Sequence, residues 1–159
     1  MEVTMKITGL THIVVCVTDI EQSIKFYTEM MGFQITEGPM PPILDSEDSM
    51  GMGFADRVTR TCILECEAGF SLELAQFLEP KPACLVDKLN LVGKHHIAYQ
   101  VDDIYEWYHK WVEAGLPAYY KPVLVNAENE EDSFYWAYVK DPDGITLELN
   151  KNFIPGFKR

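Results

Sequence analysis

Four residues of this 159-residue chain have side chains that suit a divalent-metal site, and they recur in matched pairs. His12 and His96 lie 84 positions apart, and Glu73 and Glu148 lie 75 positions apart. Imidazole nitrogen and carboxylate oxygen suit Zn, Ni, Co, Mn or Fe. Two carboxylates neutralise a divalent ion, and a site that can expand to hold water or substrate is catalytic. We therefore predict one divalent metal ion held by His12, Glu73, His96 and Glu148.

The chemistry expected of such a site is proton transfer next to a carbonyl group. A substrate with two neighbouring oxygens would displace bound waters from the ion. The ion would then act as a Lewis acid and stabilise an enolate or enediolate. We accordingly expect a small-molecule carbonyl or vicinal-oxygen substrate.

Side-chain alternation places each of the four residues on the polar face of a predicted strand. The opposite face of every one of these strands carries Ile, Leu, Val or Tyr and is expected to pack beneath helices. A solvated face that simply tolerates His and Glu is the alternative interpretation. The matching of His with His and Glu with Glu across four strands favours the metal site. The small or polar neighbours on the same faces are Val14, Cys16, Ser71, Ala75, Ala98, Gln100, Thr146 and Asn150.

The first half of the chain is predicted to be a strand, a helix and three more strands. Asp19 suits the N-cap of the helix, apolar residues then recur at helical spacing, and Gly32 ends it. A Pro- and acid-rich loop is expected at 38–57, and the turn Ala68–Gly69 joins a hairpin. The strands are expected at 9–17, 33–36, 59–67 and 70–77.

The second half repeats this order. Asp102 or Asp103 can cap a helix whose apolar stripe is Ile104, Trp107, Trp111 and Ala114, and Gly115 ends it. A short segment at 117–120 leads into a polar loop at 126–132. The predicted strands are 94–101, 133–140 and 144–150, the last two joined by the tight turn DPDG (141–144).

This internal repeat predicts an α+β fold of two tandem βαβββ modules, which form a cupped mixed sheet around one metal site. His12 superposes on His96 and Asp19 on Asp103 at the same offset, and SLEL (71–74) superposes on TLEL (146–149). The expected organisation is a first module at 7–77, a linker at 78–91, a second module at 92–150 and a tail at 151–159.

Three motifs resemble the vicinal oxygen chelate superfamily, and the resemblance spans residues 8–150. They are LTHIVVCVTDIEQSIKFYTEMMGF (10–33), HHIAYQVDDI (95–104) and DPDGITLEL (141–149). The superfamily includes glyoxalase I, methylmalonyl-CoA epimerase, extradiol dioxygenases, and fosfomycin- and bleomycin-resistance proteins. Its members share paired βαβββ modules, so the resemblance implies the same fold here.

The resemblance also implies roles for individual residues. The metal ligands of glyoxalase I match His12, Glu73, His96 and Glu148 one by one, whereas His95 has the wrong strand parity. A metal-bound or metal-displaced carboxylate would serve as the base, and Glu148 and Glu73 are both candidates. The favoured function is therefore a metal-dependent isomerase, epimerase or lyase. A homodimer is also expected, because members of the superfamily are often dimers.

Three other functions stay open. His12, His96 and Glu148 alone would form the 2-His-1-carboxylate set of an extradiol-type dioxygenase, although Glu73 would occupy space needed by catechol and oxygen. A metal-free binding or resistance protein would need no His/Glu quartet. A fosfomycin-modifying transferase would need only three ligands.

Composition excludes some partners. The chain has 13 basic and 25 acidic residues, a net charge of −12, which argues against nucleic acid and anionic membrane surfaces. No apolar run reaches the ~18 to 20 residues of a membrane span, and the N-terminus lacks a leader pattern, so a cytoplasmic location is expected.

Cysteine and aromatic residues receive structural interpretations. Cys16, Cys62 and Cys66 are expected to be buried free thiols, because they fall in apolar strands. On the strand at 133–140, Trp136 and Tyr138 share one face and Tyr135 the other. Core packing is the favoured interpretation of these aromatics, and the lining of a pocket is the alternative.

Overall fold

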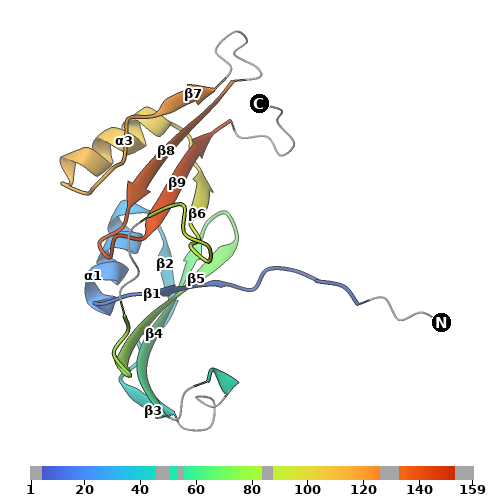
Figure 1. Ribbon diagram of the computed structural model, residues 1–159, viewed down its shortest axis with the longest axis vertical. Coiled ribbons are helices and arrows are strands. Elements are labelled where there is room, and N and C mark those ends of the chain that lie inside the picture. The colour runs from blue at the N-terminus through green and yellow to red at the C-terminus, as the bar shows by residue number, and fades with distance from the viewer. Residues whose placement is uncertain (1–4, 46–50, 54–55, 84–87, 126–132, 153–159) are drawn as a thin grey trace. The chain divides into compact units, whose positions relative to one another are not determined.

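The protein consists of two compact units, Met1–Cys84 and Leu85–Arg159, each of which is described by itself. The division falls within the predicted linker 78–91. The computed structural model describes residues 5–45, 51–53, 56–83, 88–125 and 133–152 (Figure 1). Cys84, the polar loop at 126–132, part of the loop at 38–57 and most of the tail lie outside the described residues.

In its described residues the first unit is a mixed five-stranded sheet with the helix α1 and the π-helical turn η1. Its strands run in the order β1-β5-β4-β2, and β3 also pairs with β4. β1 is parallel to β5, whereas β2, β3 and β5 are antiparallel to β4. The elements are β1 (Ile13–Cys16), α1 (Ile20–Lys25), the π-helical turn η1 (Phe26–Met30), β2 (Gln34–Glu37), β3 (Ile43–Asp45), β4 (Arg57–Cys66) and β5 (Phe70–Glu79).

The second unit repeats this arrangement with four strands in the order β6-β9-β8-β7. β6 is parallel to β9, and the other two pairings are antiparallel. The elements are β6 (Ile97–Gln100), α3 (Ile104–Glu113), β7 (Val123–Val125), β8 (Phe134–Lys140) and β9 (Thr146–Lys151). The predicted α+β class is confirmed, and each unit has its own mixed sheet.

Strand parity decides which face of each sheet joins the core. In the first unit Val15, Leu72 and Leu74 are buried beneath α1, which contacts β4 and β5. In the second unit Leu147 and Leu149 are fully buried on the side of α3, which contacts β8 and β9. Burying a Leu side chain contributes about 2 kcal/mol, so a shift of register by one residue would be strongly unfavourable.

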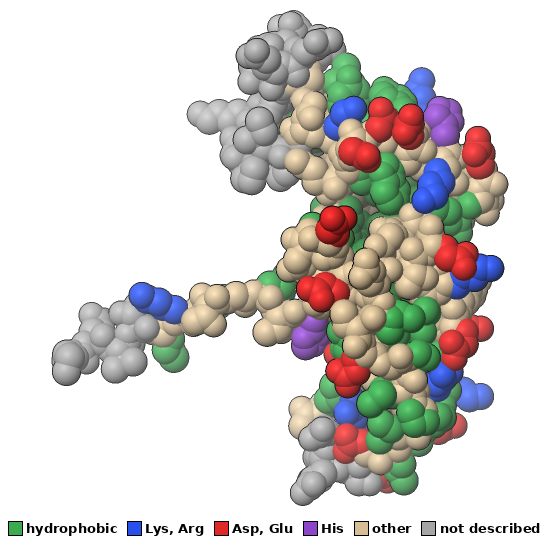
Figure 2. Space-filling model, turned by 180° about the vertical axis from the view of Figure 1, so that it is seen from behind, with side chains coloured by type: hydrophobic (Ala, Val, Ile, Leu, Met, Phe, Trp, Pro, Cys, Tyr) green, Lys and Arg blue, Asp and Glu red, His purple; other side chains and the backbone are tan. Residues whose placement is uncertain are grey.

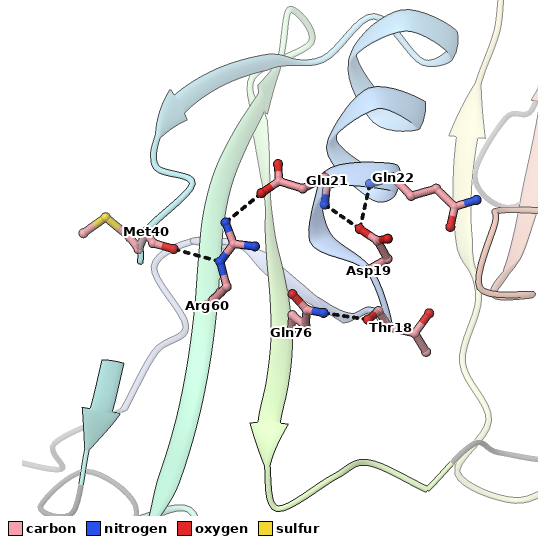
Figure 3. A network of polar contacts seen from close by, with 7 residues as sticks. All are labelled: Thr18, Asp19, Glu21, Gln22, Met40, Arg60 and Gln76. Carbon is pink, nitrogen blue, oxygen red and sulfur yellow. Dashed lines mark hydrogen bonds and ion pairs between the residues drawn. The ribbon is translucent and has the colours of Figure 1, made fainter. Parts of the chain in front are cut away.

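Both helices begin at the predicted aspartates. The Asp19 carboxylate accepts hydrogen bonds from the backbone N–H groups of Glu21 and Gln22, as Figure 3 shows. Asp103 does the same for Tyr105 and Glu106, which decides between Asp102 and Asp103 as the cap. These bonds satisfy backbone donors that have no partner within the helix.

Polar contacts also attach the start of α1 to the sheet (Figure 3). Arg60 on β4 forms an ion pair with Glu21 at 2.7 Å and donates to the backbone carbonyl of Met40. The Gln76 amide donates to the Thr18 carbonyl at 2.7 Å. The segment between β1 and α1 is therefore held against β4 and β5, next to the strand that follows His12.

Both hairpins close at a glycine with positive φ, where other residues would be strained. Gly69 has φ 84° and Gly144 has φ 79°. Gly69 N–H donates to the Cys66 carbonyl, and Gly144 N–H donates to the Asp141 carbonyl. The equivalent turns set the register of β4 with β5 and of β8 with β9.

Several predicted boundaries were wrong. β3 lies inside the segment predicted to be a loop, where it pairs with the start of β4. The segment at 117–120 contributes only a single bridge, at Ala118, and the edge strand β7 follows it. β1 and β6 begin one residue after His12 and His96, because neither histidine is part of the backbone ladder. These features depend on pairing with distant strands and not on local pattern.

The described residues contain no helix long and apolar enough to cross a membrane. Acidic side chains are scattered among basic ones on the visible face of both units (Figure 2). The net charge of −12 is therefore not gathered into one acidic patch on that face.

Candidate metal and substrate site

The first unit brings His12 beside Glu73. His12 directly precedes β1, and Val14, two residues later, is the cross-strand partner of Glu73 on β5. His12 Nε2 lies 3.4 Å from Glu73 Oε2, with both side chains partly exposed to solvent. The other ring nitrogen, Nδ1, lies 3.2 Å from the Thr11 hydroxyl. When that hydroxyl accepts from Nδ1–H, the Nε2 lone pair can serve as a metal ligand.

The second unit brings His96 beside Glu148 in the same manner. His96 directly precedes β6, and Ala98, two residues later, is the cross-strand partner of Glu148 on β9. His96 Nε2 lies 2.9 Å from Glu148 Oε2. The Glu148 side chain is 16% exposed, compared with 25% for Glu73. The sequence repeat is thus matched by an equivalent strand register in each unit.

The donor atoms of each pair suit coordination of one cation. Two donors that are each about 2.1 Å from an ion are about 3.0 Å apart at a right angle and about 3.4 Å apart at the tetrahedral angle. The His–Glu separations of 3.4 Å and 2.9 Å lie close to this range. Within either unit alone, the described residues do not bring three such ligands together. The assignment of all four residues to one ion therefore stays a prediction.

The other histidine near the site, His95, is exposed, and its parity differs from that of His96.

Cys16 was expected to be buried but is exposed, on the same face as Val14. Desolvation of its thiol, and secondarily the charge of Glu73, raise the pKa of Cys16. Cys62 is buried as expected and Cys66 is half-buried. The pKa of Cys62 is also raised, mainly by burial.

A group of aromatic side chains lies beside the second His–Glu pair. The ring of Tyr138 meets the ring of His96 edge-on, with 5.3 Å between centroids. Trp136 lies 5.2 Å from Tyr138, and Tyr119 lies 6.3 Å from it. Tyr138 and Trp136 are the cross-strand partners of Glu148 and Asn150. We call Tyr119, Trp136 and Tyr138 the aromatic face.

Strand parity in the sequence predicts that Trp136 and Tyr138 share a face. It does not predict whether this face packs in the core or stays partly exposed. Trp136 and Tyr138 are half-buried and therefore do not belong to the core proper. Tyr135, with opposite parity, instead contacts Tyr105 of α3. Two features were missed from the sequence: Tyr119 joins this face through the bridge at Ala118, and Asn150 is buried. Neither has a local sequence signal.

The two sheets and their helices define a class of fold built from duplicated βαβββ modules. A family model for the glyoxalase/bleomycin resistance protein/dioxygenase superfamily matches residues 9–149. The chain therefore belongs to the glyoxalase/bleomycin resistance protein/dioxygenase superfamily. None of the curated proteins matches the chain significantly.

Solved structures of this superfamily share the fold. A glyoxalase family protein from Bacillus cereus has a TM-score of 0.76 at 17% identity, over 95% of this chain and 98% of that chain. A glyoxalase family protein from Enterococcus faecalis has a TM-score of 0.61 at 18% identity, over 90% and 97%. The trypanothione-dependent glyoxalase I of Leishmania major has a TM-score of 0.60 at 22% identity, over 91% and 86%. At these identities the likeness concerns the fold alone, because one fold carries many chemistries.

Proposed function

We propose that the protein is a divalent-metal-dependent enzyme that moves a proton next to a carbonyl group, as an isomerase, epimerase or lyase. The observation that carries this proposal is the pair of equivalent His–Glu contacts, His12 with Glu73 and His96 with Glu148. Superfamily membership supports it, and one structural relative is a glyoxalase I. The complete set of four donors favours this chemistry over a metal-free binding protein.

The chain's own residues have distinct tasks in this proposal. A divalent cation supplies Lewis-acid stabilisation of the charge that develops on a carbonyl oxygen. His12 and His96 donate Nε2 lone pairs, and the Thr11 hydroxyl orients His12 through Nδ1. One glutamate carboxylate accepts the proton from the carbon next to the carbonyl, and the other stays a ligand. Both carboxylates are partly accessible, so either can reach a small molecule.

Replacing each glutamate by glutamine identifies the base. The variant that lacks the base, either Glu73→Gln or Glu148→Gln, should keep its metal and lose about 10²- to 10⁴-fold in turnover. The variant that lacks only a ligand should lose metal affinity. Metal content is measured by elemental analysis. Proton abstraction is measured by deuterium incorporation from D₂O into hemithioacetals of 2-oxoaldehydes and into 2-substituted malonyl thioesters.

Glu106→Gln is the matched control, because Glu106 is exposed on α3 and belongs to neither His–Glu pair. It should leave metal content and exchange unchanged. Near-normal exchange in both site variants, or purified protein that binds no divalent metal when supplied with Zn, Ni, Co, Mn or Fe, would contradict the proposal.

An extradiol-type dioxygenase is the second candidate, and the aromatic face beside His96 favours it, since such an enzyme takes a ring substrate. Its 2-His-1-carboxylate set would be His12, His96 and Glu148. Protein loaded with Fe(II) under anaerobic conditions would then consume oxygen when catechols are added. Oxygen consumption that survives Glu73→Gln would favour this candidate over proton transfer.

A further inference from the structure

We propose that the second unit binds the flat, unsaturated part of the substrate against the aromatic face, and that Asn150 accepts a hydrogen bond from a donor on that group. The substrate class is thereby narrowed to metal-chelating carbonyl compounds with an aromatic or conjugated substituent. The inference rests on the proposed metal site, because the chelating oxygens of the substrate would bind the cation that His96 and Glu148 would hold.

The position of the aromatic face supports this assignment. Tyr138 contacts the His96 ring and is the cross-strand partner of Glu148, so it borders both predicted ligands of this unit. Trp136 lies two residues before Tyr138 on β8, on the same face, and is the cross-strand partner of Asn150. Both residues are only half-buried, unlike the fully buried Trp111. A flat group held near His96 can therefore meet a ring edge or face, which is the arrangement that aromatic pairs prefer.

Asn150 provides an independent observation. The residue is only 6% exposed, and its parity places it on the same face as Glu148. Its Oδ1 atom is buried and has no hydrogen-bond partner among the described residues. A buried acceptor without a donor is uncommon and unfavourable. A substrate N–H or O–H group would satisfy it.

The first unit has the same register, but its described strands carry different residues at the equivalent positions. Ile63 is the cross-strand partner of Glu73, where the second unit has Tyr138 opposite Glu148. The next pair on the same face is Thr61 with Ala75 in the first unit. In the second unit it is Trp136 with Asn150. The two units thus have the same His–Glu pair but different residues beside it. We attribute metal binding to the shared residues and recognition of the substituent to the second unit.

Two small chelators that differ only in their substituent test the inference. Benzohydroxamate and acetohydroxamate carry the same pair of chelating oxygens. Benzohydroxamate should bind the metal-loaded protein roughly two- to tenfold more tightly, as measured by titration calorimetry. Trp136→Leu and Tyr138→Leu should reduce this ratio towards one and leave acetohydroxamate affinity and metal content unchanged.

Tyr135→Leu is the matched control, because Tyr135 is the strand neighbour of Trp136 and faces α3 instead. It should keep the wild-type ratio. A ratio that is unchanged in the Trp136 and Tyr138 variants, or lost equally in Tyr135→Leu, would overturn the inference and leave the metal site intact. Failure of wild-type protein to bind any metal would overturn the inference together with the proposed function.

The contribution of Asn150 is tested with ring-hydroxylated benzohydroxamates. A hydroxyl group at the 3- or 4-position should strengthen binding roughly two- to tenfold, by donating to Oδ1. Asn150→Leu, which keeps the size of the side chain, should remove this gain and leave benzohydroxamate affinity unchanged. No gain from either hydroxyl group in the wild type, or a gain that persists in Asn150→Leu, would refute the role of Asn150.

Discussion

At the scale of single residues, equivalent positions of the two units carry the same ligands in different surroundings. Glu73 is flanked by Val14, Ala75 and Ile63, whereas Glu148 is flanked by Ala98 and Tyr138 and is less exposed. The separation from the paired histidine is 3.4 Å for Glu73 and 2.9 Å for Glu148. The two carboxylates therefore differ in exposure and in their distance from the paired histidine.

Cys16 offers a residue-scale prediction about reactivity. Desolvation of the thiol and, to a smaller extent, the negative charge of Glu73 raise its pKa, so little thiolate is present at neutral pH. Although Cys16 is exposed, it should react with iodoacetamide more slowly than an unstructured cysteine peptide, and its rate should keep rising with pH above the midpoint of the peptide. Peptide mass spectrometry measures modification at this site, and Cys16→Ser is the blank.

Glu73→Gln tests the cause of the shift. Removing the charge should lower the pKa of Cys16 only in part, because burial is the larger cause. Alkylation of Cys16 at neutral pH as fast as that of the peptide would contradict the prediction.

At the scale of elements, each helix follows the strand that begins just after the histidine, and an aspartate caps both helices. The caps have nearly the same backbone conformation, with φ −136° at Asp19 and φ −132° at Asp103. Each capped helix packs on the apolar face of its sheet, opposite the face of the His–Glu pair. The helices thus stabilise the register that holds the pairs and do not contribute to them.

The cap at Asp103 leads to a prediction about pH. Hydrogen bonds from the backbone N–H groups of Glu106 and Tyr105 hold its pKa below the ordinary value. A lowered folded-state pKa stabilises the fold at pH values above the unfolded-state pKa. That contribution is lost as the pH falls through the folded-state pKa. Asp103→Asn keeps a good capping residue that does not titrate. The free energy of unfolding of this variant should therefore fall less between neutral pH and about pH 3 than that of the wild type.

Urea denaturation at a series of pH values measures this difference. The pKa of the neighbouring Asp102 is also lowered, chiefly by the hydrogen bond from the Trp107 indole N–H. Asp102→Asn is therefore a useful comparison, since it should remove a separate part of the acid dependence. Identical pH profiles for wild type and Asp103→Asn would contradict the role of the cap.

At the scale of the whole molecule, each unit contributes half of the predicted ligand set. If one ion uses all four residues, it should couple the stability of the two units. A ligand at about 1,000 times its Kd stabilises the folded state by about 4 kcal/mol. Saturating metal should therefore raise the Tm and increase hydrogen-exchange protection in β5 and β9 together. His12→Ala should remove the gain in β9 as well as in β5.

Hydrogen exchange measured by mass spectrometry resolves the two strands. Met5→Ala is a suitable control, because Met5 is exposed and lies outside both sheets. Protection of β9 by metal that persists in His12→Ala would show that the two pairs act separately. The homodimer remains a prediction from the resemblance, and sedimentation velocity of the purified protein measures it.

The sequence by itself determined the order of the two helices and of the strands other than β3 and β7, the two caps and the apolar face of each central strand. These are consequences of local rules: the period of two in a strand, the period of 3.6 in a helix, and the capping chemistry of Asp. The internal repeat also predicted that His12 and Glu73 would correspond to His96 and Glu148. The equal register of the two units agrees with that correspondence.

The tertiary structure alone decided how the polar faces of the sheets are used. Side-chain alternation predicts that Cys16, Ala75, Thr146 and Asn150 share the faces of the His–Glu pairs. It does not predict which of these residues are buried. The structure exposes Cys16 and buries the other three. It also adds Tyr119 to the aromatic face and pairs β3 with β4. Burial and strand pairing depend on residues distant in the chain, and local periodicity carries no information about them.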